Sequence, residues 1–258
     1  MKVILENNIG SVEASSENAS FPATNLLDEH PKSKFKAASN SVSSVIITAY
    51  VTGGATAVGM VGITADAAIV TISDPNAAAW EAGTAWETGT AWSATVPDME
   101  IEEQFVEGDE NTLWVDFSEF FSNAQILVTL NQSASADTVL AAGVIVAGGV
   151  IDVPNPGYGF EVSQRDYSIS EELSNGSLWY KKRDIVKTVA GEVLVTLAQY
   201  RQMLIGFKAI GRAPTMWNVI DDYTGDELVL FGRLSEMPRY SMVSTSSARA
   251  SLSITEVL

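Results

Sequence analysis

The sequence predicts a mainly β protein of two domains. An N-terminal antiparallel jelly-roll sandwich is expected over residues 1–150, and a C-terminal β-rich domain with one helix over residues 151–258. Three observations predict this class. Short runs rich in Val, Ile and Thr follow one another with Gly or polar turns between them. Two prolines and two glycines mark a junction at residues 153–160, and only one segment has a clear helical period.

The first domain is expected to contain a series of short strands. The predicted strands are residues 43–51, 56–64, 66–73, 111–118, 124–131 and 139–149. Residues 111–118 alternate strictly, so Leu113, Val115 and Phe117 share one face. The weakly charged stretch from 45 to 72 is interrupted by four glycines and is rich in Thr and Val. That composition favours strands over a membrane helix, so we expect no membrane insertion.

One helix is predicted in the second domain, at about residues 197–210. Thr196 and Gln199 have the spacing of a capping box, and Gly211 suits the position that ends a helix. The residues expected to share its apolar stripe are Leu197, Tyr200, Leu204 and Phe207. The segments before and after this helix alternate as strands do.

The net charge of −17 is concentrated in the first domain. Residues 1–150 hold 4 Lys and Arg against 19 Asp and Glu, whereas residues 151–258 hold 11 against 13. A surface that binds nucleic acid needs basic residues to displace counterions, so this charge argues against a nucleic-acid partner. We expect the acidic domain to project and the nearly neutral domain to dock and assemble.

The residue inventory argues against an enzyme. Cysteine is absent, and the single histidine, His30, has no matching nucleophile motif in the sequence. The sequence also lacks a phosphate-binding glycine loop and a His/Cys cluster with metal-ligand spacing. We therefore predict a non-enzymatic protein that needs no cofactor, binds no nucleotide or transition metal, and is unaffected by His30→Ala.

Three tryptophans form the first candidate ligand site. Trp80, Trp86 and Trp92 recur at intervals of six residues, which places all three indoles on one face of an extended chain. Such aromatic faces stack on sugar rings, so a glycan is the candidate ligand. The alternative interpretation is packing, either at one end of the sandwich or against a neighbouring subunit. The sequence leaves both interpretations open.

Residues 98–110 hold seven carboxylates in thirteen positions. Met99, Ile101 and Phe105 fall on the same parity, which predicts an edge strand with an acidic outer face. Oxygen ligands at this density suit Ca²⁺, but the spacing of an EF-hand loop is absent, so the solvated edge strand is the favoured interpretation.

The segment FPATNLLDEHPKSKFKA (21–37) resembles the opening motif of discoidin-type domains, which are galactose-binding-like jelly rolls. The matching positions are Pro22, Ala23, Asn25, Leu26, Leu27, Asp28 and Pro31, with Phe35 at the family's aromatic position. We expect Leu26, Leu27, Val115 and Phe117 to be buried in this domain. The resemblance implies a structural Ca²⁺ near Asp28, although Glu29-His30 departs from the family's usual Gly-Asp or Gly-Asn.

The order of segments also resembles that of bacteriophage virion proteins with this jelly roll. In these proteins a junction similar to Gly157-Tyr158-Gly159-Phe160 leads to a second β-rich domain with one helix. The resemblance implies a structural or adaptor component of a tail tip or baseplate, assembled in the host cytoplasm and located in the virion. Its implied partners are other tail proteins and host-surface glycans. The alternative is a stand-alone, lectin-like carbohydrate-binding module.

The uneven charge also predicts how copies assemble. First domains that each carry a large negative charge repel one another, so a closed ring or symmetric set is expected to form through residues 151–258. The candidate interface residues are Arg165, Lys181, Lys182 and Arg183, which would pair with carboxylates of a neighbouring chain; a solvated basic strand is the alternative. A 151–258 fragment is expected to self-associate, and a 1–150 fragment to stay monomeric.

Overall fold

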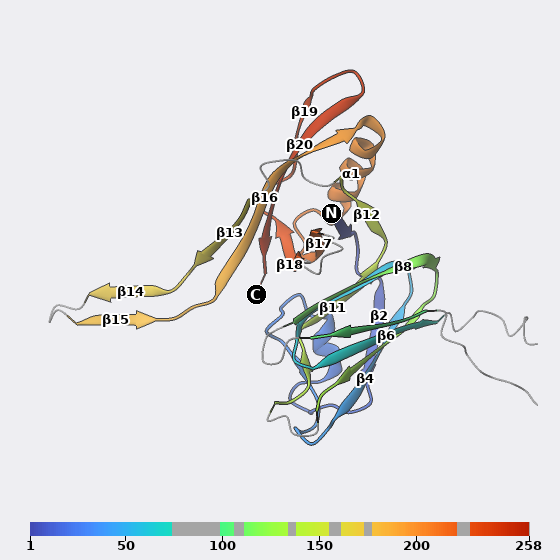
Figure 1. The fold of residues 1–258 in the computed structure, drawn as a ribbon, viewed down its shortest axis with the longest axis vertical. Coiled ribbons are helices and arrows are strands. Elements are labelled where there is room, and N and C mark those ends of the chain that lie inside the picture. The colour runs from blue at the N-terminus through green and yellow to red at the C-terminus, as the bar shows by residue number, and fades with distance from the viewer. Residues whose placement is uncertain are drawn as a thin grey trace, which may run out of the picture. The chain divides into compact units, whose positions relative to one another are not determined.

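The computed structural model describes residues 1–73, 99–105, 111–133, 138–154, 161–172, 177–220 and 228–257 (Figure 1). These residues form antiparallel sheets and a single α-helix, which confirms the predicted mainly β class. The chain divides into two compact units. The N-terminal unit is Glu6–Val150, and the C-terminal unit is Met1–Leu5 together with Ile151–Leu258.

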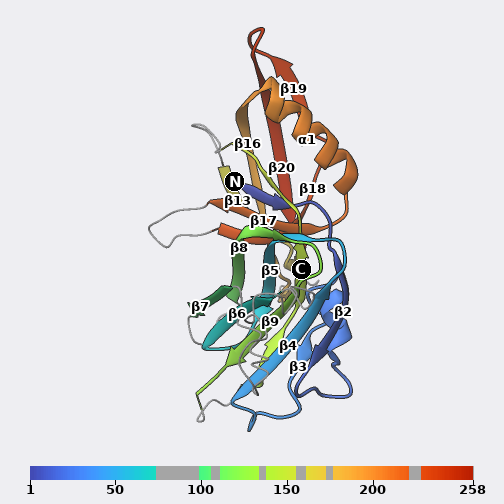
Figure 2. The same cartoon turned by 90° about the vertical axis from the view of Figure 1, so that its right-hand side faces the viewer.

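The N-terminal unit is a sandwich of two antiparallel sheets (Figure 2). The first sheet has the order β2 (Ile9–Ala14), β4 (Ser44–Val51), β9 (Gln125–Asn131), β6 (Ala67–Ser73), β7 (Met99–Gln104). The second has the order β11 (Val144–Gly148), β5 (Ala55–Ile63), β8 (Asn111–Phe121). Both sheets contribute to one hydrophobic core, for example Ile47 and Ile126 from the first and Met60 and Leu113 from the second.

Two short elements complete this unit, the pair β3 (Phe35–Lys36) with β10 (Ala141–Ala142) and a 3-10 turn, η1 (Ala23–Leu27). They hold the segment that carries the discoidin-like motif. The Glu17 carboxylate accepts a hydrogen bond from the Ala23 N–H at 2.8 Å, and the Asn25 side-chain amide donates to the Lys34 carbonyl at 3.2 Å. Gly143 lets the backbone approach closely, because a Cβ there would lie 2.7 Å from the Pro31 carbonyl oxygen.

Three of the four residues expected to be buried in this unit are buried: Leu26, Val115 and Phe117. Leu27 is only partly buried, so the expectation for it was wrong. A 3-10 turn has three residues per turn, so adjacent side chains point in different directions, and Leu27 packs against the margin of the core that encloses Leu26. The predicted acidic edge strand is confirmed, since β7 stands at the end of its sheet with Glu100, Glu102 and Glu103 exposed.

The C-terminal unit is built on one long antiparallel sheet. Its order is β12 (Val150–Asp152), β1 (Lys2–Ile4), β17 (Thr215–Ile220), β18 (Leu228–Leu234), β20 (Ser247–Glu256), β16 (Ile185–Thr196), β13 (Glu161–Asp166), with β19 (Arg239–Met242) paired to β20. Residues 1–5 were expected in the first domain but belong to this unit. Val3 is opposite Trp217 in the β1–β17 ladder, and Thr215 donates to the Ile4 carbonyl at 2.6 Å.

Helix α1 spans Leu197–Ile210, as predicted. Both halves of the capping box form, since the Thr196 N–H donates to the Gln199 side chain at 3.0 Å and the Gln199 N–H donates to the Thr196 hydroxyl at 3.3 Å. The buried face differs from the expected stripe. It consists of Met203, Gly206, Phe207 and Ile210. Leu204 is 45% exposed.

The long ladder of β13 and β16 leads into a separate two-stranded hairpin. It is formed by β14 (Ile169–Glu172) and β15 (Leu178–Lys181), which pair only with each other among the described residues. Figure 1 shows this hairpin extending away from the rest of the C-terminal sheet. We call the described residues 166–172 and 177–185 the arm.

Candidate functional site

Exposed apolar side chains gather in the C-terminal unit. Of sixteen large hydrophobic residues exposed in the described parts of the chain, thirteen belong to that unit. They are Val162, Tyr167, Leu178, Trp179, Tyr180, Ile185, Leu194, Leu204, Ile205, Ile220, Met237, Met242 and Val243. The N-terminal unit has only Phe21, Ile46 and Phe120 among its described residues. Scattered exposed residues are ordinary, but their uneven distribution makes the C-terminal unit the better candidate for contact with a partner.

The arm carries the most exposed part of this set. Leu178 is 76% exposed and Tyr180 is 61% exposed, with Trp179 between them also exposed. Because side chains alternate along a strand, Leu178 and Tyr180 lie on one face of the hairpin and Trp179 on the other. A two-stranded hairpin is marginally stable alone in water, and this one places large apolar residues of β15 on both faces, opposite Ser170, Glu171 and Glu172 of β14. The arm therefore exposes apolar surface that a partner could cover.

The base of the arm is a hydrogen-bonded elbow. The Ser168 N–H donates to the Asp166 carboxylate at 2.7 Å, and the Arg183 N–H donates to the Ser168 hydroxyl at 3.0 Å. The Arg165 guanidinium lies 4.9 Å from the centre of the Tyr167 ring. Hydrogen bonds from the side chain and backbone of Ser168, helped by the charge of Lys182, lower the pKa of Asp166 from its ordinary value of 3.8.

We expect Ser168→Ala to raise the pKa of Asp166 toward 3.8, because the largest contribution to its lowering is the Ser168 side chain. A lowered carboxyl pKa stabilises the folded elbow above the ordinary pKa, and that stabilisation is lost as pH falls through the folded value. The measurement is an NMR titration of the Asp166 side-chain carboxyl carbon. Ser163→Ala, on the exposed strand β13, is the control. An unchanged Asp166 titration in Ser168→Ala would contradict the assigned cause.

The four predicted interface residues are all exposed, and the structure brings them together around this elbow. Arg165 is the last residue but one of β13, Lys181 ends β15, and Lys182 and Arg183 lead from β15 into β16. Sequence reasoning missed the apolar residues beside them. The signal was present, since Leu178, Trp179 and Tyr180 are consecutive and therefore place large apolar groups on both faces of a predicted strand.

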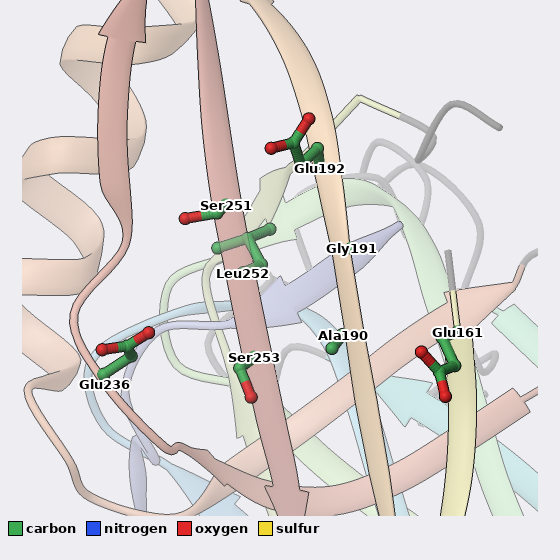
Figure 3. Close-up of a pocket in the computed structure, with 8 residues that line it drawn as sticks. All are labelled: Glu161, Ala190, Gly191, Glu192, Glu236, Ser251, Leu252 and Ser253. Carbon is green, nitrogen blue, oxygen red and sulfur yellow. The ribbon is translucent and has the colours of Figure 1, made fainter. Parts of the chain in front are cut away.

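A shallow trough of about 330 Å³ lies on the C-terminal sheet (Figure 3). The carboxylates around it are Glu161 of β13, Glu192 of β16 and Glu236, which precedes β19. Its floor consists mainly of the small residues Ala190, Gly191, Ser251 and Ser253. Ser251 and Ser253 alternate with the buried residues Leu252 and Ile254, so the trough lies on the face of the sheet opposite the core.

Two of the trough carboxylates form surface ion pairs within the unit. Glu236 lies 2.9 Å from Arg239, and Glu192 lies 3.4 Å from Arg249. The side chains of both pairs are more than half exposed, so each pair contributes little to folding stability. The trough thus presents carboxylates that remain accessible to a cationic partner.

Of the other predicted ligand residues, only Asp28 lies in the part of the chain that the structure describes. Trp80, Trp86 and Trp92 lie outside the described residues. Asp28 is exposed directly after η1, where its N–H donates to the Asn25 carbonyl at 3.1 Å. The described residues contain no group of three or more His, Asp or Glu that could hold a metal ion. The structure therefore adds no further ligand to Asp28.

A search of the described helices for a membrane span found none with the length and apolar character needed.

No family model and no curated protein matches the chain. Among solved structures, the chain is similar to reduced XRCC1 bound to the DNA pol beta catalytic domain, with 11% identity, a TM-score of 0.39, and coverage of 57% of this chain and 98% of the other. It is similar to CBM32-1 from a family 31 glycoside hydrolase of Clostridium perfringens, with 12% identity, a TM-score of 0.33, and coverage of 55% and 96%. It is also similar to truncated AlyQ with CBM32 and alginate lyase domains, with 14% identity, a TM-score of 0.36, and coverage of 73% and 49%.

Proposed function

We propose that this protein is a non-catalytic structural adaptor that self-assembles through its C-terminal unit and displays its N-terminal sandwich. The observation that carries the proposal is the concentration of exposed large apolar side chains in the C-terminal unit, thirteen of sixteen in the described residues. Burial of apolar surface drives most protein association, so the unit that exposes it is the unit that gains most from a partner.

The N-terminal unit has the opposite character. Its apolar residues are gathered in one closed core, and its acidic edge strand β7 discourages edge-to-edge pairing. Residues 1–150 also hold most of the negative charge of the chain. These features suit a domain that projects from an assembly and stays apart from its copies.

The setting we propose is a bacteriophage tail tip or baseplate, where rings of identical adaptors are placed at one end of a tail. The support is the segment order of the chain, a discoidin-like motif followed by a Gly-Tyr-Gly-Phe junction and a β-rich unit with one helix. The even spacing of Trp80, Trp86 and Trp92 favours a second role for the displayed units, weak contact with host-surface glycans. Display of several copies would raise the avidity of weak sites.

The test compares two double variants of the full chain by light scattering at micromolar concentration. Leu178→Ser with Tyr180→Ser is expected to convert an oligomer into a monomer, because it removes apolar surface from the arm. Ile46→Ser with Phe120→Ser removes two exposed apolar residues from the N-terminal unit and should leave the oligomer intact. A monomeric wild-type protein, or dissociation of the N-terminal variant alone, would refute self-assembly through the C-terminal unit.

The setting is tested separately by immunogold electron microscopy of purified virions. Antibodies against the protein are expected to label one end of the tail. Label on the capsid, or purified virions that lack the protein, would exclude the tail setting while leaving the self-assembly result unaffected.

A further inference from the structure

We propose that the arm of one copy docks across the trough of a second copy, so that assembly proceeds through a head-to-tail contact between C-terminal units. This inference rests on the proposed function and deepens it, because it names the two surfaces that meet. The occupant of the trough is thus a second copy of this chain.

Charge complementarity is the first argument. The described arm holds four acidic residues, Asp166, Glu171, Glu172 and Asp184, but its three cations, Lys181, Lys182 and Arg183, are consecutive and exposed where β15 leads into β16. The trough is bordered by the carboxylates of Glu161, Glu192 and Glu236, the last two in exposed ion pairs with Arg249 and Arg239 of the same unit. Opposite potentials on two surfaces steer their encounter and fix the register in which they meet.

Shape is the second argument. The floor residues Ala190, Gly191, Ser251 and Ser253 are small, so the middle of this exposed sheet face is low and open. In the contact that we propose, Leu178 and Tyr180, which share one face of the arm, lie over this floor. Leu194 is 60% exposed and lies on the same face of β16 as Ala190 and Glu192, which gives these side chains an apolar neighbour.

The arm and the trough of one copy lie at different positions along the β13–β16 ladder. Glu161 pairs with Ala190 at the trough, and Asp166 pairs with Ile185 at the elbow. Five residues of strand separate the two positions, roughly 17 Å, and the arm continues beyond the elbow. The contact therefore joins two copies through different surfaces, and a contact of that kind closes into a ring when the rotation between copies allows it.

A charge exchange between full-length variants tests the pairing. The arm variant carries Lys181→Glu, Lys182→Glu and Arg183→Glu, and the trough variant carries Glu161→Lys, Glu192→Lys and Glu236→Lys. Each alone is expected to self-associate about tenfold or more weakly than wild type, because the residue 181–183 cluster and the trough glutamate positions then carry the same sign. In an equimolar mixture both contacts regain opposite charges, so association should return. The control, Arg201→Glu with Lys208→Glu on the exposed face of α1, should associate as wild type does.

Cross-linking gives a second readout that does not depend on multiple charge changes. The chain has no cysteine, so Tyr180→Cys and Ser251→Cys each introduce a single thiol. Mixing these two variants under oxidising conditions should produce a disulfide-linked dimer, whereas each variant alone should produce little.

The outcomes separate this inference from the proposed function. If wild-type protein associates but neither the charge variants nor the cross-links show the expected effects, the arm–trough contact is wrong and self-assembly stands. If Tyr180→Cys couples instead to a cysteine placed at Ile205 on α1, the arm docks elsewhere and this inference is overturned. A wild-type protein that is monomeric would overturn both.

Discussion

Removal of residues 1–5 is expected to unfold the C-terminal unit and leave the N-terminal unit folded. Strand β1 lies inside the C-terminal sheet, between β12 and β17. Met1, Val3 and Ile4 are almost fully buried, and the Ile4 carbonyl accepts the Thr215 hydroxyl. Each fully buried aliphatic side chain contributes roughly 1.5–3 kcal/mol, so the deletion costs about 5 kcal/mol or more. That loss is comparable with the whole stability of a domain.

Hydrogen exchange followed by mass spectrometry measures this effect in each unit separately. In the truncated protein, amides of β16, β17 and β20 should exchange rapidly, whereas those of β4 and β9 should keep their protection. The C-terminal fragment for association studies should accordingly carry β1, and residues 6–150 form the better N-terminal fragment. Retained protection of β17 in the truncated protein would show that β1 is dispensable and would contradict the prediction.

The ends of helix α1 could be predicted because the signals that set them are local. Thr196, Gln199 and Gly211 act within one turn of the helix that they begin or end. The sequence pattern did not predict correctly which residues of α1 are buried. Gly206 allows close approach of residues distant in sequence, since a Cβ there would lie 2.2 Å from the Ile151 side chain and 2.9 Å from that of Leu5. This contact turns Leu204 outward.

The place of β1 could not be predicted from the sequence for a related reason. Residues 1–5 are contiguous with the first domain along the chain, but Val3 pairs with Trp217 from the far end of the protein. Hydrophobic patterns show that a short segment is a strand and do not show which sheet receives it. A domain boundary drawn from the sequence alone therefore places residues 1–5 in the first domain.

The candidate assembly surface was predicted in part. Runs of basic residues are visible in a sequence, so Arg165, Lys181, Lys182 and Arg183 could be singled out directly. The trough could not be predicted, because Glu161, Glu192 and Glu236 come from three separate segments. These segments meet only when β13 pairs with β16, β16 with β20, and β20 with β19. Its floor also depends on which alternate residues of β16 and β20 face outward.

Truncation of the two adjacent leucines of the discoidin-like motif is expected to lower the unfolding free energy by different amounts. Leu26 is 0% exposed within the sandwich core, whereas Leu27 is only partly buried on the next position of the 3-10 turn. Leu26→Ala leaves a cavity among Leu26's core neighbours and is expected to cost about 2–5 kcal/mol of unfolding free energy. Leu27→Ala removes the same atoms from a position that water already reaches, so the expected cost is below about 2 kcal/mol.

Hydrogen exchange of the N-terminal unit in the two variants checks this difference under one set of conditions. Because Leu26 belongs to the core of Glu6–Val150, exchange should accelerate in β4, β6 and β9 and not in β16 or β20. That pattern is the reverse of the one expected for removal of residues 1–5, so each variant serves as the control for the other. Equal losses in Leu26→Ala and Leu27→Ala would mean that both leucines are enclosed, as the motif alone predicted, and that the 3-10 turn does not divide them between core and surface.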